Sequence, residues 1–174
     1  INFYQAIVQG IGEDGGLLVP NFDFTKVDLK ELSKLNYVDL ATEVLSTFVP
    51  EDGKTLIHEA CLNAYGKGLF PEIVVPVKKA GDVYVAELFH GQTAAFKDMA
   101  LSLLPYLMTL SLKQLDEQRE VMILAATSGD TGKAALEGFK DVEGTCIKVF
   151  YPLDGVSTIQ QQQMVSQTGN NVKV

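Results

Sequence analysis

The sequence has few of the residues that bind polyanions or metal ions. Arg119 is its only arginine, and 14 basic side chains are outnumbered by 22 acidic ones, giving a net charge of −8. A surface of this charge repels phosphate backbones, so we expect no nucleic-acid partner. Cys61 and Cys146 have no metal-ligand neighbour at useful spacing, and two histidines cannot complete a zinc site with them. We therefore expect no bound metal and two reduced, buried thiols.

Long apolar segments are also missing. The most apolar uncharged run, Met99 to Leu112, is too short to span a bilayer and contains Pro105. The start of the chain shows no secretory signal. We expect a cytoplasmic protein without a membrane partner. Because the first residue is Ile1 rather than methionine, we expect a processed N-terminus or a piece of a longer protein.

What the sequence does contain is the composition of an ordinary folded protein. Its 174 residues, 47% hydrophobic and 21% charged, allow one domain or slightly more. Apolar side chains recur at helical spacing in residues 3–9, 41–48 and 57–64. Asp39 is the expected N-cap of the second of these helices. The pattern predicts a mostly helical region over residues 1–80.

The second half alternates strands and helices. Val121–Ala126 is a continuous apolar run of strand length, which predicts a strand covered on both faces. A helical pattern over 134–139 and a second strand at 146–151 follow, so the order is that of a βαβ unit with a parallel sheet. Upstream, helical spacing extends over 96–115, where Pro105 predicts a kink or a later start.

Weaker signals complete this plan. Residues 83–89 predict a strand or an extended arm, residues 157–168 a helix, and residues 172–174 a strand that has only begun. Gln160 to Gln163 form a polar run that indicates nothing catalytic. His90 follows the arm and is expected to bond to nearby backbone rather than act as an acid or base.

One segment with residue types that carry chemistry surrounds Lys97. This lysine follows Ala94, Ala95 and Phe96 and precedes an apolar helix. Apolar surroundings destabilise the charged amine, and a neutral amine can condense with an aldehyde. The alternative is a solvated, inert lysine beside Asp98 at the start of a helix, and local composition alone favours it.

A second such segment is the loop Thr127–Gly132, between the strand at 121–126 and the next helix. Its glycines let the backbone approach a ligand closely, and the first amides of a helix favour negative charge. Ser128 and Thr131 add hydroxyl donors, so the loop suits a carboxylate or phosphate without any arginine. The alternative is a plain strand-to-helix turn with Asp130 or Thr131 as its N-cap. The loop matches neither the P-loop nor the dinucleotide-binding pattern.

In these two segments the sequence resembles the threonine synthase family of fold type II pyridoxal phosphate enzymes. The resemblance continues through nearly the whole chain. It rests on the N-terminal stretch Phe3 to Pro20, the lysine motif Glu87–Asp98, the SGDTG loop in Ala126–Ala134 and the YPxxxVSxIQxxQM segment in Val149–Gln163. The departures from the family pattern, none of which removes a reactive group, are Gln92, Ala94 and Pro105.

The resemblance implies an α/β fold class. Residues 1–80 would be an N-terminal mostly helical region. Residues 81–174 would be the first α/β portion of a three-layer αβα domain with a mainly parallel sheet, truncated at its C-terminal end. In the family the cofactor-phosphate loop lies in a later part, so we expect this chain to be inactive by itself.

The resemblance also implies a reaction, the conversion of O-phospho-L-homoserine and water to L-threonine and phosphate. Lys97 would hold pyridoxal 5'-phosphate as an aldimine and then move protons at the substrate carbons. Asp130 would also contact the cofactor. The residues that would bind the substrate carboxylate are Thr127, Ser128, Gly129, Asp130 and Thr131. The amino-acid phosphate is the expected partner, and the full-length protein is expected to be a monomer.

Two other functions remain open. One is a threonine-synthase-like phospholyase, which would release a keto acid from the same substrate class and would also need Lys97. The other is a non-catalytic anion-binding α/β module, for which Lys97 would be dispensable.

Overall fold

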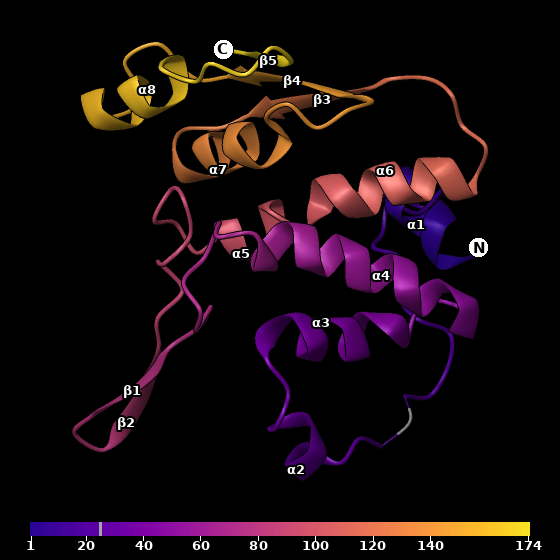
Figure 1. Cartoon of the computed structure of the whole chain (residues 1–174). Helices are drawn as coiled ribbons and strands as arrows, with labels where there is room; N and C mark the ends of the chain where they lie inside the picture. Colours follow the sequence, from indigo (N-terminus) through magenta and orange to yellow (C-terminus); the bar gives the residue numbers. More distant parts are fainter. Residues whose placement is uncertain (25) are drawn as a thin grey trace.

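The helical spacing of the first 80 residues produces a layer of short helices. The computed structural model describes residues 1–24 and 26–174. The helices are α1 (Phe3–Gln9), α2 (Leu29–Leu32), α3 (Tyr37–Ser46) and α4 (Lys54–Cys61), with a 3₁₀ turn η1 (Glu51–Gly53) before α4 and a π turn η2 (Leu62–Gly66) after it. Helix α4 lies between α3 and a later helix, α6 (Leu104–Gln114) (Figure 1).

Side-chain caps determine where these helices begin. The Asn2 side chain accepts a hydrogen bond from the Gln5 amide, and the Asn2 amide donates one to the Gln5 side chain, so α1 starts with a capping box. The prediction that Asp39 caps α3 is wrong. Asn36 is the N-cap and accepts from the Asp39 amide at 3.0 Å. Asp39 instead lies in the first turn, where its charge favours the helix.

One hydrophobic core lies between α4, η2 and α6. Ile57, Cys61 and Ala64 of α4 and η2 are fully buried there, and Leu103 and Leu107 meet them from the α6 side. Burial raises the pKa of the Cys61 thiol, which keeps it protonated. The expected burial of a thiol is therefore confirmed at this cysteine.

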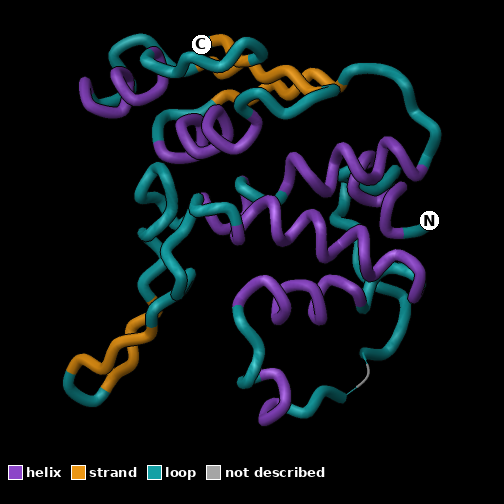
Figure 2. The backbone as a smooth tube through the Cα atoms, in the orientation of Figure 1, coloured by secondary structure: helices purple, strands orange, loops and turns teal. Residues whose placement is uncertain are grey.

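A two-stranded hairpin follows the helical layer in the sequence and projects away from it. Strands β1 (Val77–Ala80) and β2 (Val83–Ala86) pair antiparallel, and all of their residues are exposed. Figure 2 shows the hairpin standing away from the helices. Its base is tied by Glu87, whose carboxylate lies 2.9 Å from Lys78 Nζ and 2.8 Å from His90 Nε2. The prediction that His90 bonds to nearby backbone is therefore wrong, because its ring bonds to the Glu87 side chain.

The predicted helix over 96–115 is interrupted as Pro105 indicated. A single turn, α5 (Asp98–Leu101), is followed by α6, which begins one residue before Pro105. A proline in the first turn of a helix removes an amide that has no partner there in any case. Pro105 is therefore compatible with the start of α6. No helix within residues 1–24 and 26–174 has the length and apolar character needed to cross a membrane.

The βαβ unit is confirmed. Strands β3 (Val121–Ala126), β4 (Thr145–Phe150) and β5 (Val172–Lys173) form a parallel sheet in the order β3-β4-β5. Helices α7 (Asp130–Phe139) and α8 (Thr158–Val165) pack on this sheet. Their shared core contains Leu136, Phe139, Ile147, Val149 and Met164, all nearly inaccessible to solvent.

Only one face of this sheet is covered by the described residues. Met122 and Leu124 of β3 are 46% and 67% exposed, and Phe150 of β4 is also exposed. The prediction that β3 is covered on both faces is therefore not met within these residues. Cys146 lies on the same open face with its Sγ 3.4 Å from Met122 Sδ, and it is half-buried rather than buried.

Replacement of Leu136 by alanine tests the core of the βαβ unit. Leu136 is fully buried, and the cavity left by Leu136→Ala should lower the free energy of unfolding by about 2–5 kcal/mol. The matched control is Leu153→Ala, because Leu153 is 86% exposed and should change stability by less than about 0.5 kcal/mol. Urea denaturation measures both, and equal losses would contradict this packing.

A pH titration tests the base of the hairpin. Hydrogen bonds from His90 and Lys78 hold the pKa of Glu87 below its ordinary value. Their stabilisation is therefore complete above the unfolded pKa of about 4.3 and disappears as the pH falls through the lower folded pKa. We expect amide NMR signals of β1 and β2 to move in that acidic range, and to lose this dependence in Glu87→Gln. A Glu72→Gln control at an exposed position should keep it.

Candidate functional site

The loop between β3 and α7 first continues the sheet and then presents the start of a helix. The Thr127 amide donates to the Phe150 carbonyl at 2.9 Å, and Thr127 Oγ1 accepts from the Gly129 amide at 3.3 Å. Gly129 is the N-cap and provides no side chain to accept from the first amides of α7. Those amides favour an anion. A cap at Asp130 or Thr131, the alternative expectation, is wrong because both lie inside the helix.

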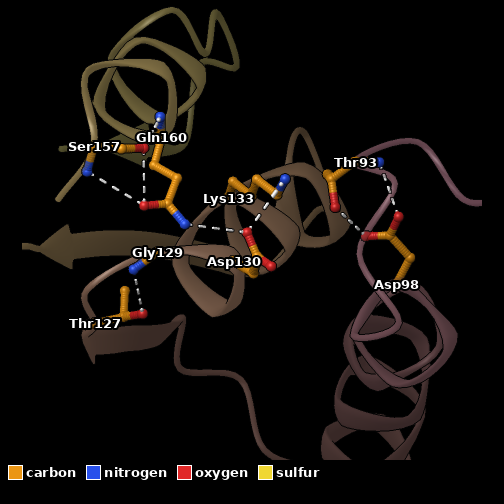
Figure 3. A network of polar contacts seen from close by, with 8 residues as sticks. All are labelled: Thr93, Asp98, Thr127, Gly129, Asp130, Lys133, Ser157 and Gln160. Atoms are coloured by element: carbon orange, nitrogen blue, oxygen red, sulfur yellow. Dashed lines mark hydrogen bonds and ion pairs between the residues drawn. The ribbon is translucent and has the colours of Figure 1, made fainter. Parts of the chain in front are cut away.

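Two glycines of this loop have side chains of other residues packed close to their Cα atoms. A Cβ added to Gly132 would lie 2.5 Å from Thr127 Cγ2 and 3.0 Å from Met164 Sδ. A Cβ added to Gly129 would lie 2.7 Å from Gln160 Nε2. Glycine at these positions lets α7 begin against the core and lets Gln160 of α8 approach the loop backbone (Figure 3).

Gln160 is a residue of this loop's surroundings that the sequence analysis missed. Its Oε1 accepts from Ser157 Oγ at 3.1 Å, and its Nε2 lies 3.5 Å from Asp130 Oδ1. Ser157 and Gln160 form the capping box that starts α8. The Ser-x-x-Gln spacing was the available signal, but a cap signal alone does not say that the glutamine reaches another loop.

The five predicted substrate-binding residues, 127–131, differ in exposure. Ser128 and Asp130 are exposed, and the others are half-buried or buried. Lys133, in the first turn of α7, has a side chain only 11% exposed, and its Nζ lies 3.4 Å from Asp130 Oδ1. Because this lysine partly neutralises Asp130, the carboxylate repels an incoming anion less than its charge alone would suggest.

Lys97 lies immediately before α5 and is half-buried. Its Nζ is 4.4 Å from the centroid of the Phe96 ring, which is a cation–π contact. It takes part in none of the ion pairs found among the described residues. The amine is therefore neither fully solvated nor paired with a carboxylate. This lies between the two alternatives drawn from the sequence, a desolvated reactive amine and a solvated inert one.

The loop before Lys97 is closed by the next residue, Asp98. The Asp98 side chain accepts from the Thr93 amide at 2.8 Å and from Thr93 Oγ1 at 2.5 Å, and the residue is only 3% exposed. Figure 3 shows this pair beside α7. Lys97 thus lies at the end of a loop that the Thr93–Asp98 hydrogen bonds close.

Close packing joins α5, which follows the loop around Lys97 (the lysine loop, residues 93–97), to α7, which follows the loop 127–132 (the glycine loop). Gly138 of α7 passes so near the carbonyl of Leu101 in α5 that an added Cβ would collide with it. On its other side, α5 is held by the Tyr65 hydroxyl, which donates to the Met99 carbonyl at 2.6 Å. Figures 1 and 3 both place the loop of Thr93 beside α7, whose first turn follows the glycine loop.

The chemical groups gathered here fit a lysine-bound organic cofactor and an anionic substrate. Lys97 offers a primary amine, residues 128–131 offer backbone amides, and Ser128 and Thr131 offer hydroxyls. Within the described part of the chain no three His, Cys, Asp or Glu side chains cluster as metal ligands would. The amine and anion-binding groups thus match the chemistry that the sequence resemblance implies.

Comparison with known proteins agrees with this arrangement. Residues 1–65 match the family model described as "Threonine synthase N terminus". The chain is 36% identical to threonine synthase of Pseudomonas aeruginosa, in an alignment that covers 99% of the chain and 37% of that protein. It is 34% identical to human threonine synthase-like 1, with 97% and 24% covered.

A solved structure extends the similarity to the fold. The PLP-bound threonine synthase from Brucella melitensis superposes with a TM-score of 0.86 at 35% identity, covering 99% of this chain and 37% of that one. The chain therefore spans well under half the length of the relatives that it matches. In sequence and in fold, it corresponds to the N-terminal part of the threonine synthase family.

Proposed function

We propose that this chain is the N-terminal part of a threonine synthase that converts O-phospho-L-homoserine and water to L-threonine and phosphate. The observation that carries the proposal is the packing of α5, which follows the Lys97 loop, against α7, which begins at the glycine loop. The similarity to the threonine synthase of Pseudomonas aeruginosa over 99% of the chain supports it. Because the chain spans only part of these relatives, the reaction is proposed for the whole protein, and residues 1–174 alone are expected to make no threonine.

In this proposal Lys97 would hold pyridoxal phosphate, which would supply an electron sink for charge that develops on the substrate carbons. The amine of Lys97 holds the cofactor and, once released from it, accepts and returns protons at those carbons. The first amides of α7 and the hydroxyls of Ser128 and Thr131 bind the substrate carboxylate. Asp130 contacts the cofactor, while Thr127 and Gly129 shape the loop through their mutual hydrogen bond.

The same proposal covers the partners, the cellular location and the oligomeric state of the protein. A net charge of −8 opposes nucleic-acid binding. We propose a cytoplasmic monomer whose partner is the small amino-acid phosphate. The supporting observation for a small anionic ligand is the uncapped start of α7, which needs no arginine to attract it.

A second candidate is a phospholyase that uses the same substrate class but releases a keto acid. Both enzymes would use Lys97 in the same way, so the two differ in the product and not in the residues described here.

Substitution of Lys97 separates both enzymes from a non-catalytic module. In the full-length protein, pyridoxal phosphate followed by borohydride should label Lys97, because the amine condenses with the aldehyde and the product is reduced. Lys97→Ala should abolish this label and the turnover of phosphohomoserine. Lys113→Ala, at an exposed position of α6, should retain both. Peptide mass spectrometry locates the label, and unchanged labelling and turnover in Lys97→Ala would favour the binding module.

Product analysis separates the two enzymes. With O-phospho-L-homoserine, the full-length protein should release threonine and phosphate in equal amounts. Chromatography of the amino acid, together with a keto-acid assay, measures the partition. Release of 2-oxobutyrate without threonine would replace the main proposal by the phospholyase.

A further inference from the structure

We propose that Asp98 is a positioning residue for Lys97, acting through its closure of the loop that carries the lysine. The inference rests on the proposed function, since it concerns the amine that would bind the cofactor. It adds a role for a residue that neither the lysine motif nor the glycine loop assigns.

The first argument is the burial of the Asp98 carboxylate without a cation. The residue is 3% exposed, yet it takes part in none of the ion pairs found among the described residues. A buried carboxylate is costly unless donors satisfy it. The donors are the amide and the hydroxyl of Thr93, at 2.8 and 2.5 Å. One side chain thus joins both ends of the loop 93–98.

The second argument is how tightly the loop closes around this carboxylate. A Cβ added to Gly91 would lie 2.5 Å from both Asp98 Cβ and Asp98 Oδ2, so the backbone at Gly91 lies directly against the aspartate. Ala94 adopts a φ of 56°, in the left-handed region that costs a non-glycine residue energy. The Ala94 amide donates to the Gly91 carbonyl at 3.1 Å. The strained turn persists because Asp98 and Thr93 hold it.

The third argument is that the backbone of Lys97 is fixed on both of its sides. On the loop side, Asp98 ties the chain back to Thr93. On the helix side, the Lys97 carbonyl accepts from the Ala100 and Leu101 amides at 3.1 and 2.9 Å. The side chain of Lys97 is therefore the part that can move, while its Cα position is set. This is what a lysine needs in order to reach a cofactor aldehyde with a defined geometry.

The test measures labelling of Lys97 in the full-length protein, in addition to activity. Asp98→Asn keeps the size of the side chain but removes one of the two acceptor oxygens. At a temperature where the variant is folded, we expect the rate of borohydride-trapped labelling of Lys97 to fall by about tenfold or more. Asp28→Asn is the matched control, because Asp28 is an exposed cap that accepts from the Lys30 amide at 2.8 Å. Its labelling rate should equal that of the wild type.

A second pair of variants covers the case in which Asp98→Asn does not fold. Thr93→Val removes only the hydroxyl and should slow labelling in the same direction, whereas Thr93→Ser restores the hydroxyl and should recover the rate. Circular dichroism and the thermal midpoint report folding separately. A role in stability alone would lower the midpoint and leave the labelling rate of the folded protein unchanged, which would overturn the proposal.

The outcomes distinguish this inference from the proposed function. If wild-type protein is labelled at Lys97 and folded Asp98→Asn and Thr93→Val are labelled equally fast, the positioning role is wrong and the proposed function stands. If the wild type itself is not labelled, both are wrong. Slower labelling in the variants, with recovery in Thr93→Ser, supports both.

Discussion

The contact of α7 with α5 is the constraint on which the rest of this arrangement depends. Gly138 allows the two helices to approach until its Cα lies against the Leu101 carbonyl, which no larger residue would permit. The lysine loop leads into α5, and the glycine loop leads into α7. Their relative position is therefore set by helix packing rather than by any bond between the loops. Tyr65 reinforces it by tying α5 to the helical layer through the Met99 carbonyl.

Around this contact, the site relies on neutral donors where many anion sites use arginine. The glycine loop presents helix amides and hydroxyls, and its one carboxylate, Asp130, lies near Lys133. Asp98 in turn is satisfied by Thr93 and not by a cation. Among the described residues Lys97 has no carboxylate partner, and its Nζ lies over the Phe96 ring. A side chain with no ion pair to break is easier to redirect than one held by a carboxylate.

Much of the fold could be predicted from the sequence where local patterns agree with tertiary packing. The apolar runs at 121–126 and 146–151 identified the parallel strands, and Pro105 identified the interrupted helix because a proline's missing amide acts locally. Asn36 was missed because Asp39, another good cap, follows only three residues later. The open face of β3 was missed because a continuous apolar run reports the residue types and not which neighbours are present.

The candidate site could be predicted only in part, for a similar reason. Lys97 and residues 127–131 carry motif signals, and the resemblance named them. The family correspondence is now shown, while the role of each of these residues stays a prediction. Gln160 and Thr93 could not be found because they reach the site across 30 residues or by closing a loop, and neither relation leaves a periodic pattern.

The open face of the parallel sheet gives residues 1–174 a physical character of their own. Met122, Leu124 and Phe150 place exposed apolar area beside an unpaired edge of β3, a surface that favours self-association. The net charge of −8 opposes it through long-range repulsion. Salt screens the charge repulsion and strengthens apolar association. Self-association of this chain should therefore be weak in dilute buffer and increase with salt concentration.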